Sequence, residues 1–332
     1  MTIQFAKRSL ALLLMCSTGI TPLALAQDAL VPTNASGKAP PMDPAAIAAR
    51  LAADPALFVR VAQQQAKWNE PAEPFRVAGP IYFVGTVGLG VFLIKTTDGL
   101  ILMNTGMPSS GPMIEASIRK LGFDPKDIKI LIACHAHIDH VGAMAYMKRL
   151  TGAQMVMMEP DVAELESGGK IDFHYAGVDG FSYEPVKVDR VIRDGDTVKL
   201  GDVILTGRLT PGHSRGATTW TTSIVDGGKA YSVVFPDGGG VNPGYRVERD
   251  PDYPGIGNDY RRTLYFLETL RPDIWLGSHN ETYGLFAKKA RAATAGVSAW
   301  VDPEGYRRFI ADQSTKFAQT VDREMGGPAP AK

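Results

Sequence analysis

The stretch that decides the fold runs from residue 130 to residue 142 and reads Ile-Leu-Ile-Ala-Cys-His-Ala-His-Ile-Asp-His-Val-Gly. Its first five residues are apolar or small, which predicts a buried strand over 130–134. A helix is expected after Gly142, over about 143–150. Between these two elements lie four side chains that can bind a metal ion: His135, His137, Asp139 and His140.

The spacing of these four side chains indicates two metals rather than one. Side chains alternate along an extended chain, so His135, His137 and Asp139 are expected to point the same way. The loop must then turn, which brings His140 in from another side. Imidazole and carboxylate groups suit zinc, and an open catalytic zinc takes three protein ligands. Four candidates within six residues therefore predict two adjacent ions that share a solvent-derived bridge.

Length and composition bound the possible functions. The chain has 332 residues, of which 45% are hydrophobic, so it can bury a sizeable core. It carries 35 basic and 35 acidic residues, which argues against a nucleic-acid partner held by bulk charge. Of its six histidines, three fall in one hexapeptide, which chance explains poorly.

The first 26 residues have the pattern of a signal peptide. Lys7 and Arg8 precede an apolar run over 9–16, and Ala24-Leu25-Ala26 fits a cleavage site. The mature chain is expected to begin near Gln27 in the periplasm and to have no membrane segment. An uncleaved anchor is the alternative. Residues 27–42, rich in Ala and Pro, predict a flexible arm before one domain over 43–332.

Cleavage would leave Cys134 as the one cysteine, so no internal disulfide is expected. A lipoprotein modified at Cys16 is disfavoured, because Leu14 and Met15 are not the small residues expected before such a cysteine. Alternation along the strand points Cys134 away from the ligands, so it is interpreted as a packing residue.

The remaining pattern contains two runs of strands with helices around them. Helices are predicted at 44–53, 55–67, 110–121, 143–150, 160–166, 259–270, 284–296 and 303–325. Strands are predicted at 81–85, 90–95, 99–103, 130–134 and 154–158, and in a second run at 189–193, 196–200, 203–210, 217–224, 229–236 and 273–276. This order favours an α/β fold in which two sheets pack face to face with helices outside.

Two further histidines lie at strand ends. His213 sits in the turn Thr210-Pro-Gly-His-Ser-Arg-Gly216, and His279 follows the strand at 273–276. If these loops converge with that of His135, five imidazoles and one carboxylate make two three-ligand sites. The segment 167–186 lacks a clear period and is expected to be a loop beside the site, with His174 lining a pocket rather than binding metal.

These motifs resemble the metallo-β-lactamase superfamily and, within it, the subclass B3 β-lactamases. The superfamily resemblance is carried by His135-Ala-His-Ile-Asp-His140, Pro211-Gly-His213 and Gly277-Ser-His279. The subclass resemblance, over about 60–300, rests on Trp68-Asn-Glu-Pro71, Pro74-Phe75, Asn104-Thr-Gly106, Asn242-Pro-Gly-Tyr245 and Tyr260-Arg-Arg262.

The resemblance implies a four-layer αββα sandwich with two zinc ions. His135, His137 and His213 would bind the first zinc, and Asp139, His140 and His279 the second. A hydroxide on the metals would attack the β-lactam carbonyl, and Asp139 would orient it as the catalytic residue. A secreted enzyme of this kind would take a small β-lactam substrate and confer resistance to it, and a monomer is favoured.

Two departures from the family pattern leave alternatives open. Many members have a C-terminal disulfide, and many have serines where this chain has Gly238, Gly239 and Gly240, which puts substrate contacts in doubt. A glyoxalase II-like thioesterase or a lactonase, with Asp237 as a bridging ligand, is the main alternative. A periplasmic zinc-binding protein without turnover is another, although the open metal positions argue against it.

Overall fold

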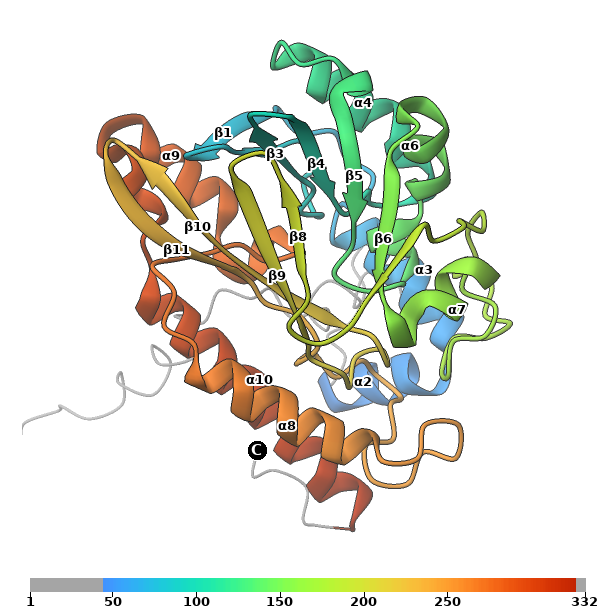
Figure 1. Ribbon diagram of the computed structural model, residues 1–332. Helices are drawn as coiled ribbons and strands as arrows, with labels where there is room; N and C mark the ends of the chain where they lie inside the picture. Colours follow the sequence, from blue (N-terminus) through green and yellow to red (C-terminus); the bar gives the residue numbers. More distant parts are fainter. Residues whose placement is uncertain (1–43, 327–332) are drawn as a thin grey trace, which may run out of the picture.

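The computed structural model describes residues 44–326, and in it two β-sheets pack face to face between helical layers (Figure 1). The first sheet has the order β1-β2-β3-β4-β5-β6-β7. Its strands are β1 (Phe75–Ala78), β2 (Ile81–Phe83), β3 (Phe92–Thr96), β4 (Gly99–Met103), β5 (Ile128–Ile132), β6 (Gln154–Met158) and β7 (Arg190–Ile192). Neighbours are antiparallel from β1 to β4 and parallel from β4 to β7.

The second sheet has the order β12-β11-β10-β9-β8. Its strands are β8 (Thr197–Leu200), β9 (Val203–Leu209), β10 (Thr218–Asp226), β11 (Lys229–Phe235) and β12 (Ile274–Trp275). All pairs are antiparallel except β11 and β12. The short parallel strand β12 leaves His279 at its carboxyl end.

Alternating apolar residues build the layers. On β3, Phe92 and Ile94 belong to the core between the sheets, whereas Leu93 belongs to the core beneath the helices. That outer layer contains α4 (Gly111–Lys120), α5 (Ile138–Val141), α6 (Met144–Thr151) and α7 (Val162–Ser167). Strands buried on both faces need apolar residues at every position, as the run 128–132 largely has.

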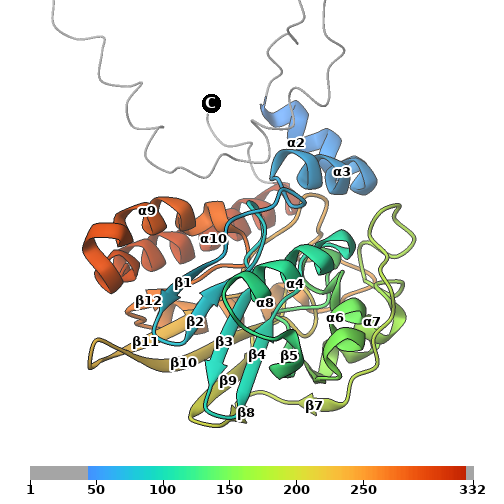
Figure 2. The ribbon, with the colours of Figure 1, turned by 90° about the horizontal axis from the view of Figure 1, so that it is seen from above.

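Helices α8 (Ile256–Thr269), α9 (Leu285–Ala295) and α10 (Pro303–Glu324) form the other outer layer (Figure 1). The apolar stripe of α10 is buried at Tyr306, Ile310 and Phe317, so it packs the core as the sequence indicates. Helices α2 (Pro44–Ala53) and α3 (Pro55–Gln65) lie beside each other next to the sandwich (Figure 2). The four-layer αββα architecture is thereby confirmed.

Three local predictions differ from the structure. Strand β7 pairs with β6 in the first sheet, although its sequence opens the second run of strands. Strand β1 is an additional edge strand that pairs with β2. The helical turn α5 starts at Ile138, so the extended chain ends at His137 and the expected shared parity of Asp139 is wrong.

The predicted signal peptide and flexible arm lie outside the described residues. Within residues 44–326, no helix combines the length and the apolar character that crossing a bilayer requires.

Candidate metal centre

The loop after β5 is anchored to both sheets. The Thr218 backbone N–H at the start of β10 donates to the Cys134 carbonyl at 2.7 Å, and the Trp220 indole donates to the Ala133 carbonyl at 2.9 Å. Cys134 itself is a buried free thiol, in agreement with its predicted packing role. These bonds hold the start of the histidine loop between the sheets, where side chains from both can reach it.

Helix α5 turns the metal-binding side chains toward one another. His137 is extended (φ −78°, ψ 154°) and caps the helical turn that carries Asp139 and His140. The Thr105 backbone N–H donates to the His140 carbonyl at 2.7 Å. Gly142 follows this turn, and a Cβ there would lie 2.4 Å from the Ile138 carbonyl oxygen and 2.5 Å from Pro108 Cδ, so only glycine fits. The turn therefore depends on a residue without a side chain.

The loops after β5 and β9 bring the first predicted ligand group together. His135, His137 and His213 each offer one ring nitrogen, and these nitrogens lie within 4.8 Å of one another. His135 and His137 are 2% exposed. His213 is half-buried, so this cluster of three imidazoles from loops of two sheets has a more open side and matches a three-ligand zinc site.

Each of these three rings has its other nitrogen bound by an acceptor. His213 Nδ1 lies 2.8 Å from the Gly240 carbonyl oxygen, which can only accept, so Nδ1 carries the proton. His135 Nδ1 pairs with Asp237 Oδ2 at 2.6 Å. His137 Nε2 pairs with Asp172 Oδ2 at 3.2 Å. The tautomers leave His135 Nε2, His137 Nδ1 and His213 Nε2 with free lone pairs for a metal.

The second predicted group surrounds one carboxylate. Asp139 Oδ2 lies 3.2 Å from His140 Nε2 and 3.4 Å from His279 Nε2. The His279 side chain is 32% exposed, and its ring centre lies 5.6 Å from that of Trp68 with the two planes tilted by 38°, so His279 forms the open side of the centre. All six sequence-predicted ligands thus lie in one cluster, although they come from three loops.

The protonation states of His135, His213 and Asp139 suit a cation, whereas Asp172 raises the pKa of His137 against the effect of burial, so zinc would displace a proton there. Burial lowers the pKa of His135 and lowers that of His213 to about 3, so both imidazoles are neutral near pH 7. Burial alone would raise the pKa of Asp139, but the neighbouring His140 and His279 lower it below its usual range. Neutral imidazoles and an ionised carboxylate are the forms that bind metal.

Two buried atoms support the fit to zinc. Within the part of the chain that the structure describes, His135 Nε2 is buried without a hydrogen-bond partner, and His140 Nε2 makes no well-directed hydrogen bond although Asp139 Oδ2 lies 3.2 Å away. A buried polar atom of this kind costs free energy unless something binds it. Because both atoms face the cluster, a divalent cation is the partner that their chemistry favours.

Sequence reasoning missed the acids behind the first group. Asp172 fixes the His137 ring, and its own pKa, which burial would raise, is lowered to about 2 by His137. Glu164 is close to both, but burial raises its pKa well above 4.5 and favours its neutral form. Both residues occupy aperiodic or short helical segments, so no local signal marks them. They support His137 from behind.

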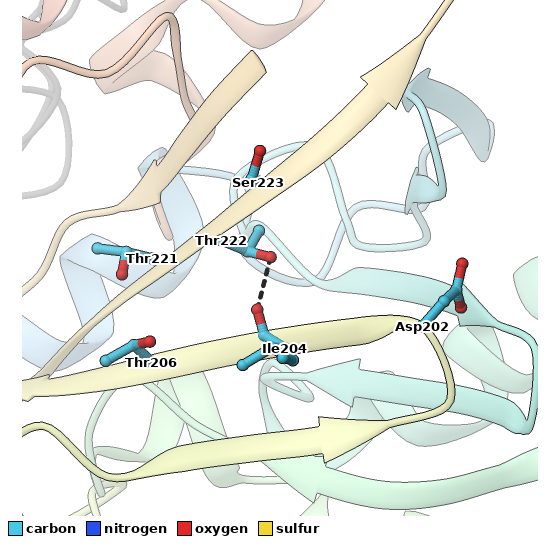
Figure 3. A pocket seen from close by; sticks show the side chains of 6 residues that line it. All are labelled: Asp202, Ile204, Thr206, Thr221, Thr222 and Ser223. Carbon is cyan, nitrogen blue, oxygen red and sulfur yellow. Dashed lines mark hydrogen bonds between the residues drawn. The ribbon is translucent and has the colours of Figure 1, made fainter. Parts of the chain in front are cut away.

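Two other features lie apart from the centre. His174, in the loop over 167–186, has its ring centre 4.8 Å from that of Tyr245 and belongs to none of the candidate metal groups. A surface hollow of about 420 Å³ on β9 and β10 contains none of the candidate ligands (Figure 3). It is lined by Asp202, Ile204, Thr206, Thr221, Thr222 and Ser223.

Comparison with known proteins agrees with this architecture. The family model described as the metallo-beta-lactamase superfamily matches residues 91–279, and the chain belongs to that superfamily. Its resemblance to subclass B3 is confirmed by solved structures. A metallo-beta-lactamase from Legionella gormanii is 41% identical, with a TM-score of 0.76, over 78% of this chain and 98% of that one.

Two further solved structures are similar. A subclass B3 metallo-beta-lactamase of Bradyrhizobium japonicum is 39% identical, with a TM-score of 0.74, over 80% of this chain and 98% of that one. A class B3 di-zinc metallo-beta-lactamase from an Alaskan soil metagenome is 32% identical, with a TM-score of 0.74, over 77% and 97%.

Curated relatives match over shorter stretches. A hydroxyacylglutathione hydrolase from Rhodopseudomonas palustris is 27% identical over 123 residues, and a probable metallo-hydrolase from Burkholderia pseudomallei is 26% identical over 96. The chain spans 39% and 32% of their lengths.

Proposed function

We propose that the chain is a two-zinc β-lactamase of subclass B3 that hydrolyses the β-lactam amide. The observation that carries this proposal is the set of three imidazoles His135, His137 and His213. Each has one ring nitrogen beside an acceptor, and the three offer ring nitrogens within 4.8 Å of one another. Similarity to B3 enzymes over nearly their whole length supports the substrate class.

His135, His137 and His213 would hold the first zinc, and Asp139, His140 and His279 the second. Bound zinc would lower the pKa of water and polarise a carbonyl oxygen. The chain's own part is to fix the ring orientations and exclude bulk water, which the burial of His135 and His137 achieves. The His279 side chain is partly exposed, so a small amide substrate would enter the centre from that side.

Asp139 is the residue that we assign to proton handling. Its Oδ2 lies between His140 and His279 and remains ionised in this setting, so it can accept a hydrogen bond from the attacking water and orient it. No serine nucleophile is required in this scheme.

A parallel substrate screen tests the proposal. Purified protein is offered nitrocefin, a lactone and a thioester, each with and without a zinc chelator. We expect nitrocefin hydrolysis that stops with chelator and returns with zinc. Expression in a sensitive host should raise the β-lactam concentration that the host survives. Zinc content well below two equivalents together with intact nitrocefin would exclude the proposal.

A thioesterase or lactonase is the second candidate, since part of the chain resembles a hydroxyacylglutathione hydrolase. In that reading Asp237 would bridge the two metals. Its carboxylate is instead paired with His135 Nδ1 at 2.6 Å, on the side of the ring away from the free Nε2. This orientation favours the β-lactamase.

We also propose export to the periplasm, which the basic and apolar pattern of residues 1–26 supports. Mass spectrometry of the protein from a periplasmic extract should give a chain that begins near Gln27. Retention of the full-length chain in the cytoplasm or membrane fraction would exclude cleavage there.

A further inference from the structure

A buried carboxylate behind the metal-binding loops is not one of the six candidate ligands. Asp161 ends the 3-10 turn η3 (Glu159–Asp161) after β6, and it is fully buried. Its Oδ2 accepts hydrogen bonds from the Ala136 backbone N–H at 3.1 Å and from the Ser214 hydroxyl at 2.8 Å. Its Oδ1 accepts one from the Gly216 backbone N–H at 2.5 Å. Both oxygens are thus engaged by the chain itself.

The three donors belong to the two loops that carry the first group of imidazoles. Ala136 lies between His135 and His137, and Ser214 directly follows His213. These loops follow strands of different sheets, β5 and β9, so their separation depends on contacts between the sheets. A single carboxylate that is hydrogen-bonded to both loops therefore links His135 and His137 on one loop to His213 on the other.

The chain at Gly216 is shaped for this link. A Cβ at Gly216 would lie 2.5 Å from the Asp161 backbone nitrogen and 2.6 Å from its Cγ. Such a close approach is open only to glycine, so the second loop is pressed directly against the carboxylate. Burial raises the pKa of Asp161, while the bonds from Ser214 and Gly216 oppose that rise.

We infer that Asp161 is a positioning residue that holds the His213 loop against the His135–His137 loop and so sets the geometry of the first metal group. The inference rests on the proposed zinc site. Residues that orient metal ligands from behind change metal affinity by about 10- to 100-fold when they are replaced. An Asp161 that merely stabilised the fold would leave metal affinity unchanged in the folded protein.

The test is Asp161→Asn, which has nearly the same shape but one acceptor oxygen in place of two. At least one of the Ala136 and Gly216 N–H groups then loses its acceptor. We expect zinc affinity at the first site, measured by competition with a chromophoric chelator, to fall about 10- to 100-fold. Zinc at the second group should remain, and the visible spectrum of the cobalt-substituted protein should change.

Ser214→Ala keeps the inference testable if Asp161→Asn does not fold. It removes one donor and leaves both backbone donors, so we expect a measurable loss of zinc affinity that is smaller than that of Asp161→Asn, up to about 10-fold. Combining the two substitutions should cost less than the sum of their separate effects, because both act through one carboxylate.

Asp273→Asn is the matched control. Asp273 also accepts hydrogen bonds from a backbone N–H and a hydroxyl, both of Ser232 and both at 2.8 Å. It lies before β12, whereas the candidate ligand His279 lies after that strand, so these bonds hold no metal-binding loop. Wild-type zinc affinity is expected. Unchanged affinity and cobalt spectra in Asp161→Asn and Ser214→Ala would overturn the inference and leave the proposed function intact. An unsubstituted chain that binds no zinc would overturn both.

Discussion

At the scale of single residues, the centre depends on which nitrogen of each imidazole carries a proton. Three different acceptors settle this: a carboxylate for His135, another for His137 and a backbone carbonyl for His213. An acceptor on one nitrogen leaves the other free to bind metal. Changing an acceptor should therefore affect zinc without touching a ligand.

Asp237→Asn tests whether this residue is a partner of His135 or a bridge between metals. The amide oxygen can still accept from Nδ1–H, so we expect two bound zinc ions and at most about a 10-fold loss of affinity at the first site. Asp237→Ala removes the acceptor and should cost about 100-fold. Elemental analysis and chelator competition measure both. Loss of zinc from both sites in Asp237→Asn would instead indicate a bridging ligand.

Asn104 holds the strand ends together from an unusual backbone conformation. It has φ +62°, its Oδ1 accepts from the Cys134 N–H at 3.0 Å, and its Nδ2 lies 3.3 Å from the Ser278 hydroxyl. Asn104→Ala should lower the free energy of unfolding by about 3 kcal/mol, through backbone strain and an orphaned N–H. Asn104→Gly avoids the strain and should cost less. Equal urea midpoints for the two variants would contradict this account.

At the scale of elements, loops and caps decide where the metal-binding ends can lie. The segment after β11 folds under the β9 loop, with Gly238 at φ +88° and Gly240 beside His213. The ion pair of Lys288 and Asp302 joins α9 to the start of α10. Both features can be tested by substitutions that alter one contact at a time.

The three glycines after Asp237 are not equivalent. A Cβ at Gly238 would lie 1.7 Å from the Thr210 carbonyl oxygen, whereas one at Gly240 would have Gln313 Oε1 at 3.5 Å and His213 Nδ1 at 3.7 Å. Gly238→Ser should therefore destabilise the protein by at least about 3 kcal/mol. Gly240→Ser should stay within about 0.5 kcal/mol. Urea unfolding measures both, and equal effects would refute the argument.

The Lys288–Asp302 pair gives a pH-dependent prediction. Lys288 is 3% exposed, and its Nζ lies 2.9 Å from Asp302 Oδ2 and 5.0 Å from the Trp275 ring centre. Burial would raise the pKa of Asp302, but Lys288 lowers it below the usual 3.8. The stabilisation is therefore present above pH 3.8 and disappears as the pH falls through the lowered folded-state value.

Asp302→Asn leaves the Lys288 ammonium without its counter-charge and should cost about 2 kcal/mol at pH 7. The difference from wild type should stay constant from pH 5 to 8 and shrink below about pH 4. Urea unfolding of the zinc-free protein across this range measures it. Lys288→Met is the control: it removes the buried ammonium, so Asp302 is no longer needed as a counter-charge, and stability should change little. A difference that persists in acid would contradict the assignment.

At the scale of the whole molecule, the centre joins the two sheets. Its imidazoles come from the loops after β5, β9 and β12, and Trp220 of the second sheet bonds to the end of β5. A ligand that binds only the folded arrangement stabilises every element that contributes to it. Zinc should therefore couple the stability of the two sheets.

Removal of zinc tests this coupling. With zinc at 1,000 times its dissociation constant, binding should add about 4 kcal/mol to the free energy of unfolding. Chelator should lower the midpoint of one shared thermal transition, followed by near- and far-ultraviolet circular dichroism, and zinc should restore it. Chelator already saturated with zinc is the control. An unchanged midpoint would show that the cluster is stable without metal.

The sequence alone determines most of the strands, the helix starts and the candidate metal ligands, because the patterns that indicate them are local. The alternation of apolar residues predicts nearly all the strands, and Asp-Pro pairs such as Asp54-Pro55 mark helix starts that the structure contains. The spacing from His135 to His140 and the strand-end positions of His213 and His279 point to the six residues that the structure brings together. Local periodicity and ligand chemistry need no information about distant parts of the chain.

Only the tertiary structure decided how those residues are supported. The pairing of Asp237 with His135, of Asp172 with His137 and of Asp161 with two loops joins residues 25 to 102 positions apart. The sheet to which β7 belongs and the helical turn at Ile138 were likewise settled by packing. Such contacts depend on how separate elements meet in space, and no pattern within one element records that.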